Sequence, residues 1–88
     1  MAKVECVGWP GCAVWFWSKD HREAHFHVAS PGNWEVRVFF GSEPPYYDVV
    51  MQVGRIPGKK MRAFLLEVAA NREKLFLEWD RKVIVEDP

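Results

Sequence analysis

The stretch Pro57–Lys82, PGKKMRAFLLEVAANREKLFLEWDRK, decides the fold class. Pro57 suits the first turn of a helix, where its missing N–H costs nothing. Glu78 is spaced for ion pairs with Lys74 and Lys82 on a solvated side. The apolar residues of one stripe fall in one broad sector of a helical wheel. They are Met61, Phe64, Leu65, Val68, Ala69, Leu75, Phe76 and Trp79. The pattern predicts one long C-terminal helix over about 58–82.

Short segments with a different period precede this helix. Trp34–Phe40 places alternate side chains on opposite faces, which is the period of a β-strand. His25–Ser30 alternates in the same way, and Pro31-Gly32-Asn33 between them is typical of a tight turn. Further strands are expected at residues 3–7, 12–18 and 46–53. Short strands joined by tight turns favour an antiparallel meander.

The predicted elements together form one α+β domain over residues 1–88. We expect a small antiparallel sheet of four to five strands, over about 3–53, packed on the single helix. A loose tail or a short edge strand is expected over 83–88. With 49% hydrophobic and 15% aromatic residues, the chain is not of the disordered class.

Charge and apolar runs limit the partners and the compartment. Twelve Lys and Arg balance twelve Asp and Glu, so net charge does not favour nucleic acid as a partner. No stretch approaches the roughly 20 apolar residues of a membrane span. The opening MAKVECV lacks the charged and apolar regions of a secretory signal. We therefore expect a cytoplasmic protein with no membrane partner and with free thiols at Cys6 and Cys12.

One helix covers only one face of a sheet, so the apolar side chains on the other face are left without a cover from this chain. The second predicted strand is apolar on both sides. Either of its two sets of alternate side chains can lie on the face that the helix does not cover. The sets are Ala13, Trp15 and Trp17, or Cys12, Val14 and Phe16. An uncovered apolar face usually marks a protein interface. We expect a homodimer or a small heteromeric protein partner, and Trp15 and Trp17 are candidate contact residues.

All three histidines lie within DHREAHFH, residues 20–27. His25 and His27 point to one side of a strand because side chains alternate. His21, beside Asp20, can fold back toward them from the preceding loop. Such a cluster suits acid–base or phosphate chemistry or a transition metal. The plain alternative is a set of polar residues on an exposed edge strand. We expect no metal and no other cofactor.

Arg72 occupies the middle of the apolar stripe of the helix. A charge there must be paired or must reach the edge of the core, and Asn71 before it is a poor mid-helix residue. Two interpretations remain open: the helix kinks or restarts near Asn71, or Arg72 reaches a polar site on the sheet. In the second, Arg72 joins His25 and His27 as candidate catalytic residues of one anion site. Asp20 is then the acid that orients a member of that site.

A basic segment begins the helix. Its cations are Arg55, Lys59, Lys60 and Arg62, and it contains no acid. Cations at a helix N-terminus work against the macrodipole, whereas the free N–H groups there bind anions. We interpret the segment as a solvated loop or as a contact for a phosphate or an acidic partner.

Three segments carry a family resemblance: VWFWS at 14–18, DHREAHFHV at 20–28 and NREKLFLEW at 71–79. With them the chain resembles the prokaryotic family called domain of unknown function 4160. The resemblance implies a short bacterial or archaeal protein, often encoded beside a second small domain in an arrangement like a toxin–antitoxin pair. The resemblance implies that the chain shares these polar residues with the family: Asp20, His21, His25, His27, Asn71 and Arg72. It implies no activity.

Two functions follow as hypotheses, and they leave open whether the protein is an enzyme. The first is a partner-binding component of a toxin–antitoxin-like two-gene module, which the aromatic excess and the uncovered face favour. The alternative is a small metal-independent nuclease or phosphate-ester enzyme. In that enzyme His25 and His27 act as base and acid, and Arg72 or the basic segment stabilises the developing negative charge.

Overall fold

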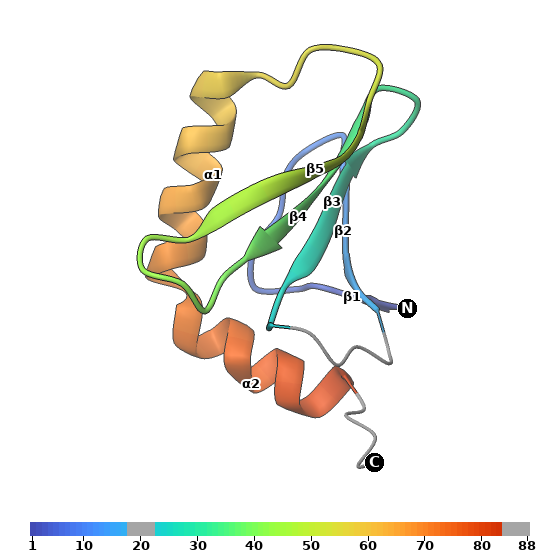
Figure 1. The fold of residues 1–88 in the computed structure, drawn as a ribbon. Coiled ribbons are helices and arrows are strands. Elements are labelled where there is room, and N and C mark those ends of the chain that lie inside the picture. The colour runs from blue at the N-terminus through green and yellow to red at the C-terminus, as the bar shows by residue number, and fades with distance from the viewer. Residues whose placement is uncertain (18–22, 84–88) are drawn as a thin grey trace.

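The computed structural model describes residues 1–17 and 23–83, which form a five-stranded antiparallel sheet and two helices (Figure 1). The strands are β1 (Ala2–Lys3), β2 (Ala13–Phe16), β3 (Phe26–Ser30), β4 (Trp34–Phe39) and β5 (Tyr46–Gln52); the helices are α1 (Gly58–Ala70) and α2 (Arg72–Lys82). The strands lie across the sheet in chain order, which is a meander. The predicted α+β class and antiparallel sheet are therefore confirmed.

The β3–β4 hairpin sets the register of the central strands. Its turn closes with the N–H of Asn33 donating to the carbonyl of Ser30 at 2.9 Å. Gly32 has φ +79°, a left-handed conformation in which a side chain is strained. Because Ser30 pairs with Trp34, Val28 meets Val36 and the apolar alternates of both strands share one face. The turn residues thus decide which side chains enter the core.

Strand β1 is shorter than the strand predicted over 3–7. It covers only Ala2–Lys3, and one further ladder bond joins the N–H of Val4 to the carbonyl of Val14. The backbone N–H groups of Glu5 and Cys6 donate instead to the carboxylate of Glu78 in α2. A charged acceptor has replaced the strand partner, so the chain leaves the sheet at this point.

The single long helix of the sequence analysis is two helices. The first ends at Ala70 and the second begins at Arg72, so Asn71 lies between them with φ −112° and ψ 16°. Its side-chain amide donates to the carbonyl of Glu67 at 2.8 Å, which is a bond that competes with helical continuation. The axes of α1 and α2 bend sharply at this residue (Figure 1). No helix of the described part of the chain combines the length and the apolar character needed to cross a bilayer.

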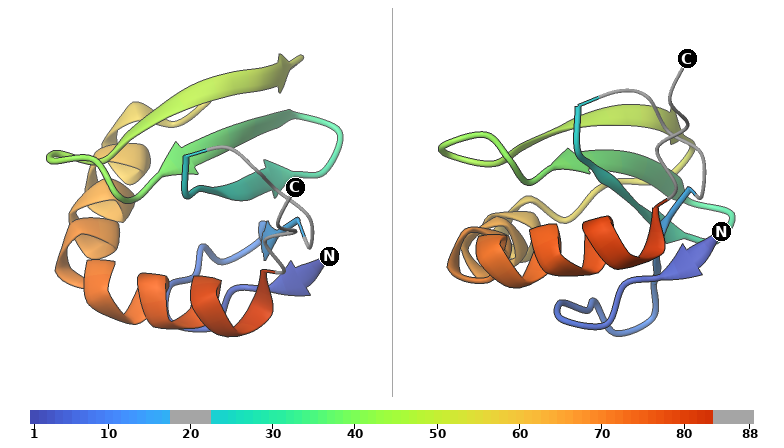
Figure 2. Two further views of the ribbon diagram at one scale, coloured as in Figure 1. Left: turned by 60° about the horizontal axis from the view of Figure 1, so that its bottom comes forward. Right: turned by 90° about the horizontal axis from the view of Figure 1, so that it is seen from below.

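The core lies between the helices and the inner face of the sheet, which is the face that both helices cover (Figure 2). The buried sheet residues are Val14, Phe16, Phe26, Val28, Trp34, Val36 and Val38, joined by Phe40 just beyond β4. From the helices, Met61, Phe64, Val68, Leu75 and Trp79 are buried as the wheel predicts. Two members of the predicted stripe depart from it: Leu65 is half-buried, and Phe76 is 37% exposed while its ring still contacts Phe40.

The end of α2 is fixed by Val83. This residue is buried and its N–H donates to the carbonyl of Trp79 at 2.8 Å. The predicted loose tail over 83–88 is therefore wrong for Val83, and its remaining residues, 84–88, lie outside the described part of the chain.

Candidate functional site

Six aromatic rings in contact cross the outer face of the sheet, which is the face away from the helices. In spatial order they are Trp17, Trp15, His27, His25, Phe39 and Tyr46, and we call them the ring row. Successive ring centroids lie 6.2, 5.3, 5.3, 5.3 and 4.8 Å apart. The ends of the row are open, since Trp17 is 46% and Tyr46 is 45% exposed, and both imidazoles are buried.

Two polar pairs flank the centre of the ring row. His27 Nδ1 lies 3.1 Å from Glu35 Oε2, and Arg37 holds Asp48 through two hydrogen bonds of 2.9 and 2.5 Å. The register makes Trp15, His27, Arg37 and Asp48 partners on successive strands. Glu35 lies diagonally from His27, since it precedes Arg37 by two residues on β4. The polar groups at the centre therefore bind one another.

The hydrogen bonds fix one ring proton on each histidine. His25 Nδ1 lies 2.8 Å from the carbonyl oxygen of Glu23, and His27 Nδ1 faces a carboxylate oxygen. Because both partners are acceptors, Nδ1 carries the hydrogen in each ring. Burial lowers the pKa of His27 below its usual range, against the hydrogen bond to Glu35, which acts to raise it. His27 is therefore neutral at pH 7, and its Nε2 is an acceptor.

The lowered pKa of His27 makes the fold sensitive to acid. The unfolded chain takes up the His27 proton below about pH 6.5, before the folded chain does, so the free energy of unfolding falls as pH drops through that range. We expect the slope for His27→Gln to be smaller by up to about 1.4 kcal/mol per pH unit, because glutamine keeps a donor for Glu35 and does not titrate. Urea unfolding at a series of pH values measures this slope. Equal slopes for the two proteins would contradict the prediction.

Arg72 binds the β4–β5 loop. Its Nε donates to the carbonyl of Phe40 at 3.1 Å, its Nη2 donates to the carbonyl of Ser42 at 3.0 Å, and its Nη1 pairs with Glu43. Both open interpretations hold in part, since the helix restarts at Asn71 and Arg72 reaches polar groups at the end of the sheet. No hydrogen bond or ring contact within residues 1–17 and 23–83 joins Arg72 to the imidazoles, so the expected convergence is not seen.

Arg72 is therefore a structural tie in this fold. Arg72→Met is expected to lower the free energy of unfolding by roughly 1–3 kcal/mol, because two part-buried carbonyls lose their donors. Arg81→Met, on the exposed surface of the same helix, is the matched control and should stay within about 0.5 kcal/mol of the parent. Urea unfolding compares the two. A variant as stable as the control would show that Arg72 does not secure the loop.

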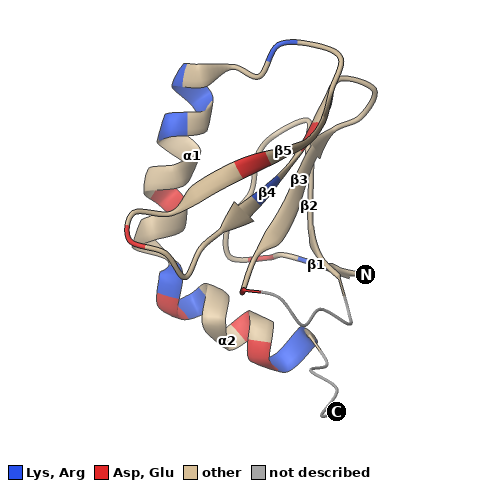
Figure 3. Cartoon of the chain, in the orientation of Figure 1, with Lys and Arg blue, Asp and Glu red and all other residues tan. Residues whose placement is uncertain are grey.

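The remaining sequence candidates lie in three places. Arg55, Lys59, Lys60 and Arg62 are exposed at the start of α1 and the loop before it, and they make no hydrogen bond or ion pair with the ring-row histidines (Figure 3). Trp15 and Trp17 belong to the ring row. Asp20 and His21 lie outside the described residues, so their expected roles stay predictions.

The buried carboxylate of Glu78 is the site residue that sequence reasoning placed wrongly. It was expected on the solvated side and is 5% exposed. It accepts the N–H of Cys6 at 2.7 Å and that of Glu5 at 3.0 Å, and it pairs with Lys82 at 2.9 Å. Burial acts to raise the pKa of Glu78, but the hydrogen bonds from Cys6, Lys82 and Glu5 outweigh it and lower this pKa to about 2. The group is ionised and holds the N-terminal segment on α2.

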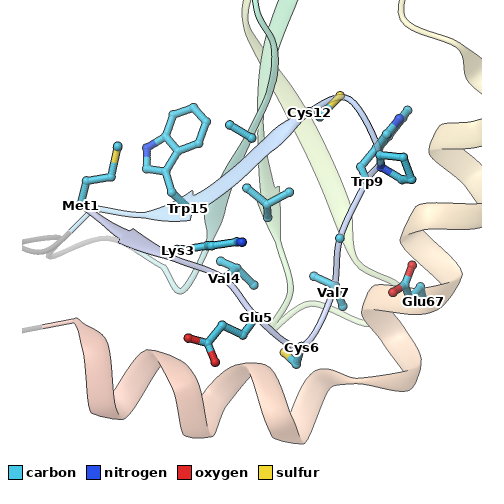
Figure 4. A pocket seen from close by; sticks show the side chains of 14 residues that line it. Met1, Lys3, Val4, Glu5, Cys6, Val7, Trp9, Cys12, Trp15 and Glu67 are labelled. Atoms are coloured by element: carbon cyan, nitrogen blue, oxygen red, sulfur yellow. The ribbon is translucent and has the colours of Figure 1, made fainter.

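An open hollow of about 1030 Å³ lies at the β1 edge of the sheet (Figure 4). Residues between 1 and 15 line it, together with Glu67 of α1. Cys6 and Cys12 are free thiols on its wall, as predicted. Burial raises the pKa of both, and the contact with Glu78 helps to bring that of Cys6 to about 12. A thiol held in this form is a weak nucleophile.

The described part of the chain contains no group of three or more His, Cys, Asp or Glu side chains placed to hold a metal ion. Comparison with known proteins identifies a family for this chain. Residues 11–80 match the sequence pattern of Domain of unknown function (DUF4160). The chain belongs to this family. No curated protein and no solved structure matches the chain.

The DUF4160 match contains the features described above. Its bounds include the whole ring row, Arg72 and Glu78, and they leave out β1 and Lys82. The part of the chain that defines DUF4160 membership is thus the part that builds the outer face and ties the β4–β5 loop.

Proposed function

We propose that this domain binds a second small protein on the outer face of its sheet, as the partner-binding component of a cytoplasmic, toxin–antitoxin-like two-gene module. The observation that carries the proposal is the ring row. It crosses a face that neither helix covers, and it ends on exposed Trp17 and Tyr46.

The residue types on this face support a protein partner. Tryptophan, tyrosine, phenylalanine and arginine are enriched where protein surfaces meet. The indole Nε1 of Trp15 is buried and has no hydrogen-bond partner within the described residues. A buried donor without an acceptor costs free energy. A small shift of Trp15 on docking lets a carbonyl of the partner accept this hydrogen bond.

The charges support a protein partner over a nucleic acid. Binding of single strands combines stacking rings with free cations along the backbone path. On this face Arg37 is held by Asp48 in a bidentate pair. The exposed cations Lys59 and Lys60 lie in the first turn of α1, and Arg55 lies in the loop before it (Figure 3). Stacking surface without free cations suits a protein surface.

The nuclease alternative places different demands on the same residues. It needs an imidazole that a phosphate can reach and a cation beside it. His25 is 2% and His27 is 7% exposed, and Arg72 binds the β4–β5 loop. We therefore favour binding over catalysis, and a catalytic role for these three residues stays a prediction.

Co-expression with the product of the adjoining gene tests the proposal. A tag on this chain should retain that product through purification. One of the two proteins expressed alone should arrest growth, and the pair should restore it. Trp17→Ser should weaken retention by more than about tenfold, the loss expected when a tryptophan that anchors an interface is removed.

Leu66→Ser is the matched control, because Leu66 is 73% exposed and lies on α1, which covers the inner face of the sheet. It should retain the partner as the parent does. Loss of retention in the control but not in Trp17→Ser would move the interface to the helices. Failure of the parent to retain the partner would remove the proposal.

A further inference from the structure

The strand β5 is an exposed edge of unusual length for this sheet. It has seven residues, it pairs with β4 on one side, and no strand of the described chain pairs with its other side. Val49 and Val50 are each 47% exposed, Met51 is 43% exposed, and Val53 just beyond the strand is 80% exposed. The opposite edge of the sheet is the two-residue β1. The free backbone and the apolar side chains of the sheet are therefore concentrated at β5.

The usual protections of an edge strand are weak here. Monomeric proteins place lysine, proline or inward charges on such strands, or keep them short. The one charged residue of β5 is Asp48, which pairs with Arg37 inside the sheet. One protection is present: Glu35 pairs with Met51 and Val36 with Val49, so Val50 forms a bulge. A bulge bends the strand but leaves its unpaired edge able to accept another strand.

The two ends of this edge carry opposite charge. At its start, Tyr46 donates to the carboxylate of exposed Glu23, and Glu43, which pairs with Arg72, precedes the strand. Past its end, the loop that leads to α1 carries Arg55, which is exposed and forms no ion pair within the described residues (Figure 3). The strand thus runs from an acidic end to a basic end.

We propose that the occupant of this edge is a second copy of the chain, with the two β5 strands antiparallel about a two-fold axis. In that arrangement the start of each strand, with Glu23, meets the end of the other strand, which is followed by Arg55. A parallel arrangement places like charges together and is unfavourable. The two sheets join into one, and Val49 and Val50 of each copy are covered. A self-complementary patch of this kind is what a two-fold dimer requires.

Sedimentation over a range of concentrations tests the dimer. The parent should be a dimer, and Val49→Lys should raise the dissociation constant by more than about tenfold, because the axis brings two like charges together. Leu66→Lys adds the same charge on α1 and should leave the constant unchanged. Circular dichroism of both variants, with Val50→Lys as a second edge variant, separates lost pairing from lost folding. A parent that stays monomeric at about 1 mM would overturn the proposal.

Charge reversal tests the antiparallel direction. Arg55→Glu alone and Glu23→Lys alone should each weaken self-association, and a mixture of the two variants should form a heterodimer in preference to either homodimer. No preference in the mixture would overturn the antiparallel alignment. The inference is independent of the proposed function, since Trp17→Ser should weaken partner binding and leave the dimer intact.

Discussion

Truncation of Trp79 to alanine is expected to lower the free energy of unfolding by about 3–5 kcal/mol, which is the range for a buried tryptophan. Trp79 is 8% exposed, and its ring lies 5.8 Å from Phe16, 6.0 Å from Phe40 and 6.3 Å from His25. It joins α2 to the sheet core and to the ring row. In a domain of 88 residues, this loss is a large part of the total stability.

Urea unfolding measures the effect, and Leu77→Ala is the matched control. Leu77 is 67% exposed on the same helix, so its truncation should change stability by less than about 0.5 kcal/mol. If Trp79→Ala does not fold, Trp79→Phe keeps a ring in the site and should show a smaller loss of the same sign. An unchanged unfolding curve for Trp79→Ala would contradict the packing of α2 on the sheet.

Replacement of Glu78 by glutamine is the second large effect. The carboxylate accepts the backbone N–H groups of Glu5 and Cys6 and pairs with Lys82. An amide offers one acceptor oxygen and no charge, so Glu78→Gln should lower the free energy of unfolding by roughly 2–4 kcal/mol. Asp80→Asn, an exposed change of the same kind on α2, should change it by less than about 0.5 kcal/mol.

The pH dependence of the free energy of unfolding tests the role of Glu78 in a second way. The pKa of Glu78 is lowered to about 2 in the folded protein. The carboxylate therefore stabilises the fold fully above its pKa in the unfolded chain, and this stabilisation is lost as pH falls through its pKa in the folded protein. The parent should therefore lose stability between about pH 4.5 and about pH 2, and Glu78→Gln should lose less over that range. Parallel curves for the two proteins would mean that the N-terminal segment does not depend on this charge.

Local pattern was enough to predict most of the strands. The turn Pro31-Gly32-Asn33 and the alternation on both sides of it determine the β3–β4 register, in which His27 meets Arg37. Extending that register by one strand on each side adds Trp15 and Asp48 to the same line. The signal for the polar centre of the ring row was thus present in the sequence, in the spacing of charged and aromatic residues around one turn.

Other features depend on contacts between distant segments. Asn71 marked a weak point in the helix, but the bend occurs because Arg72 finds acceptors in the β4–β5 loop, some 30 residues earlier in the chain. Glu78 carries the spacing of a solvated residue, and only the path of Glu5 and Cys6 over α2 makes it a buried acceptor. His25 is buried, and its ring lies 6.3 Å from that of Trp79 in α2. The periodicity of residues within one segment does not predict such contacts between distant segments.

The central claim is that a protein partner covers the ring row, and the indole N–H signals of the five tryptophans test it most directly. In a ¹⁵N-labelled chain titrated with the adjoining gene product, the account predicts shifts at Trp15 and Trp17. Trp34, buried on the helix side with its ring against that of Trp9, should stay unchanged. Single substitutions of each tryptophan assign the signals. A complex that forms while Trp15 and Trp17 keep their free positions would contradict the claim.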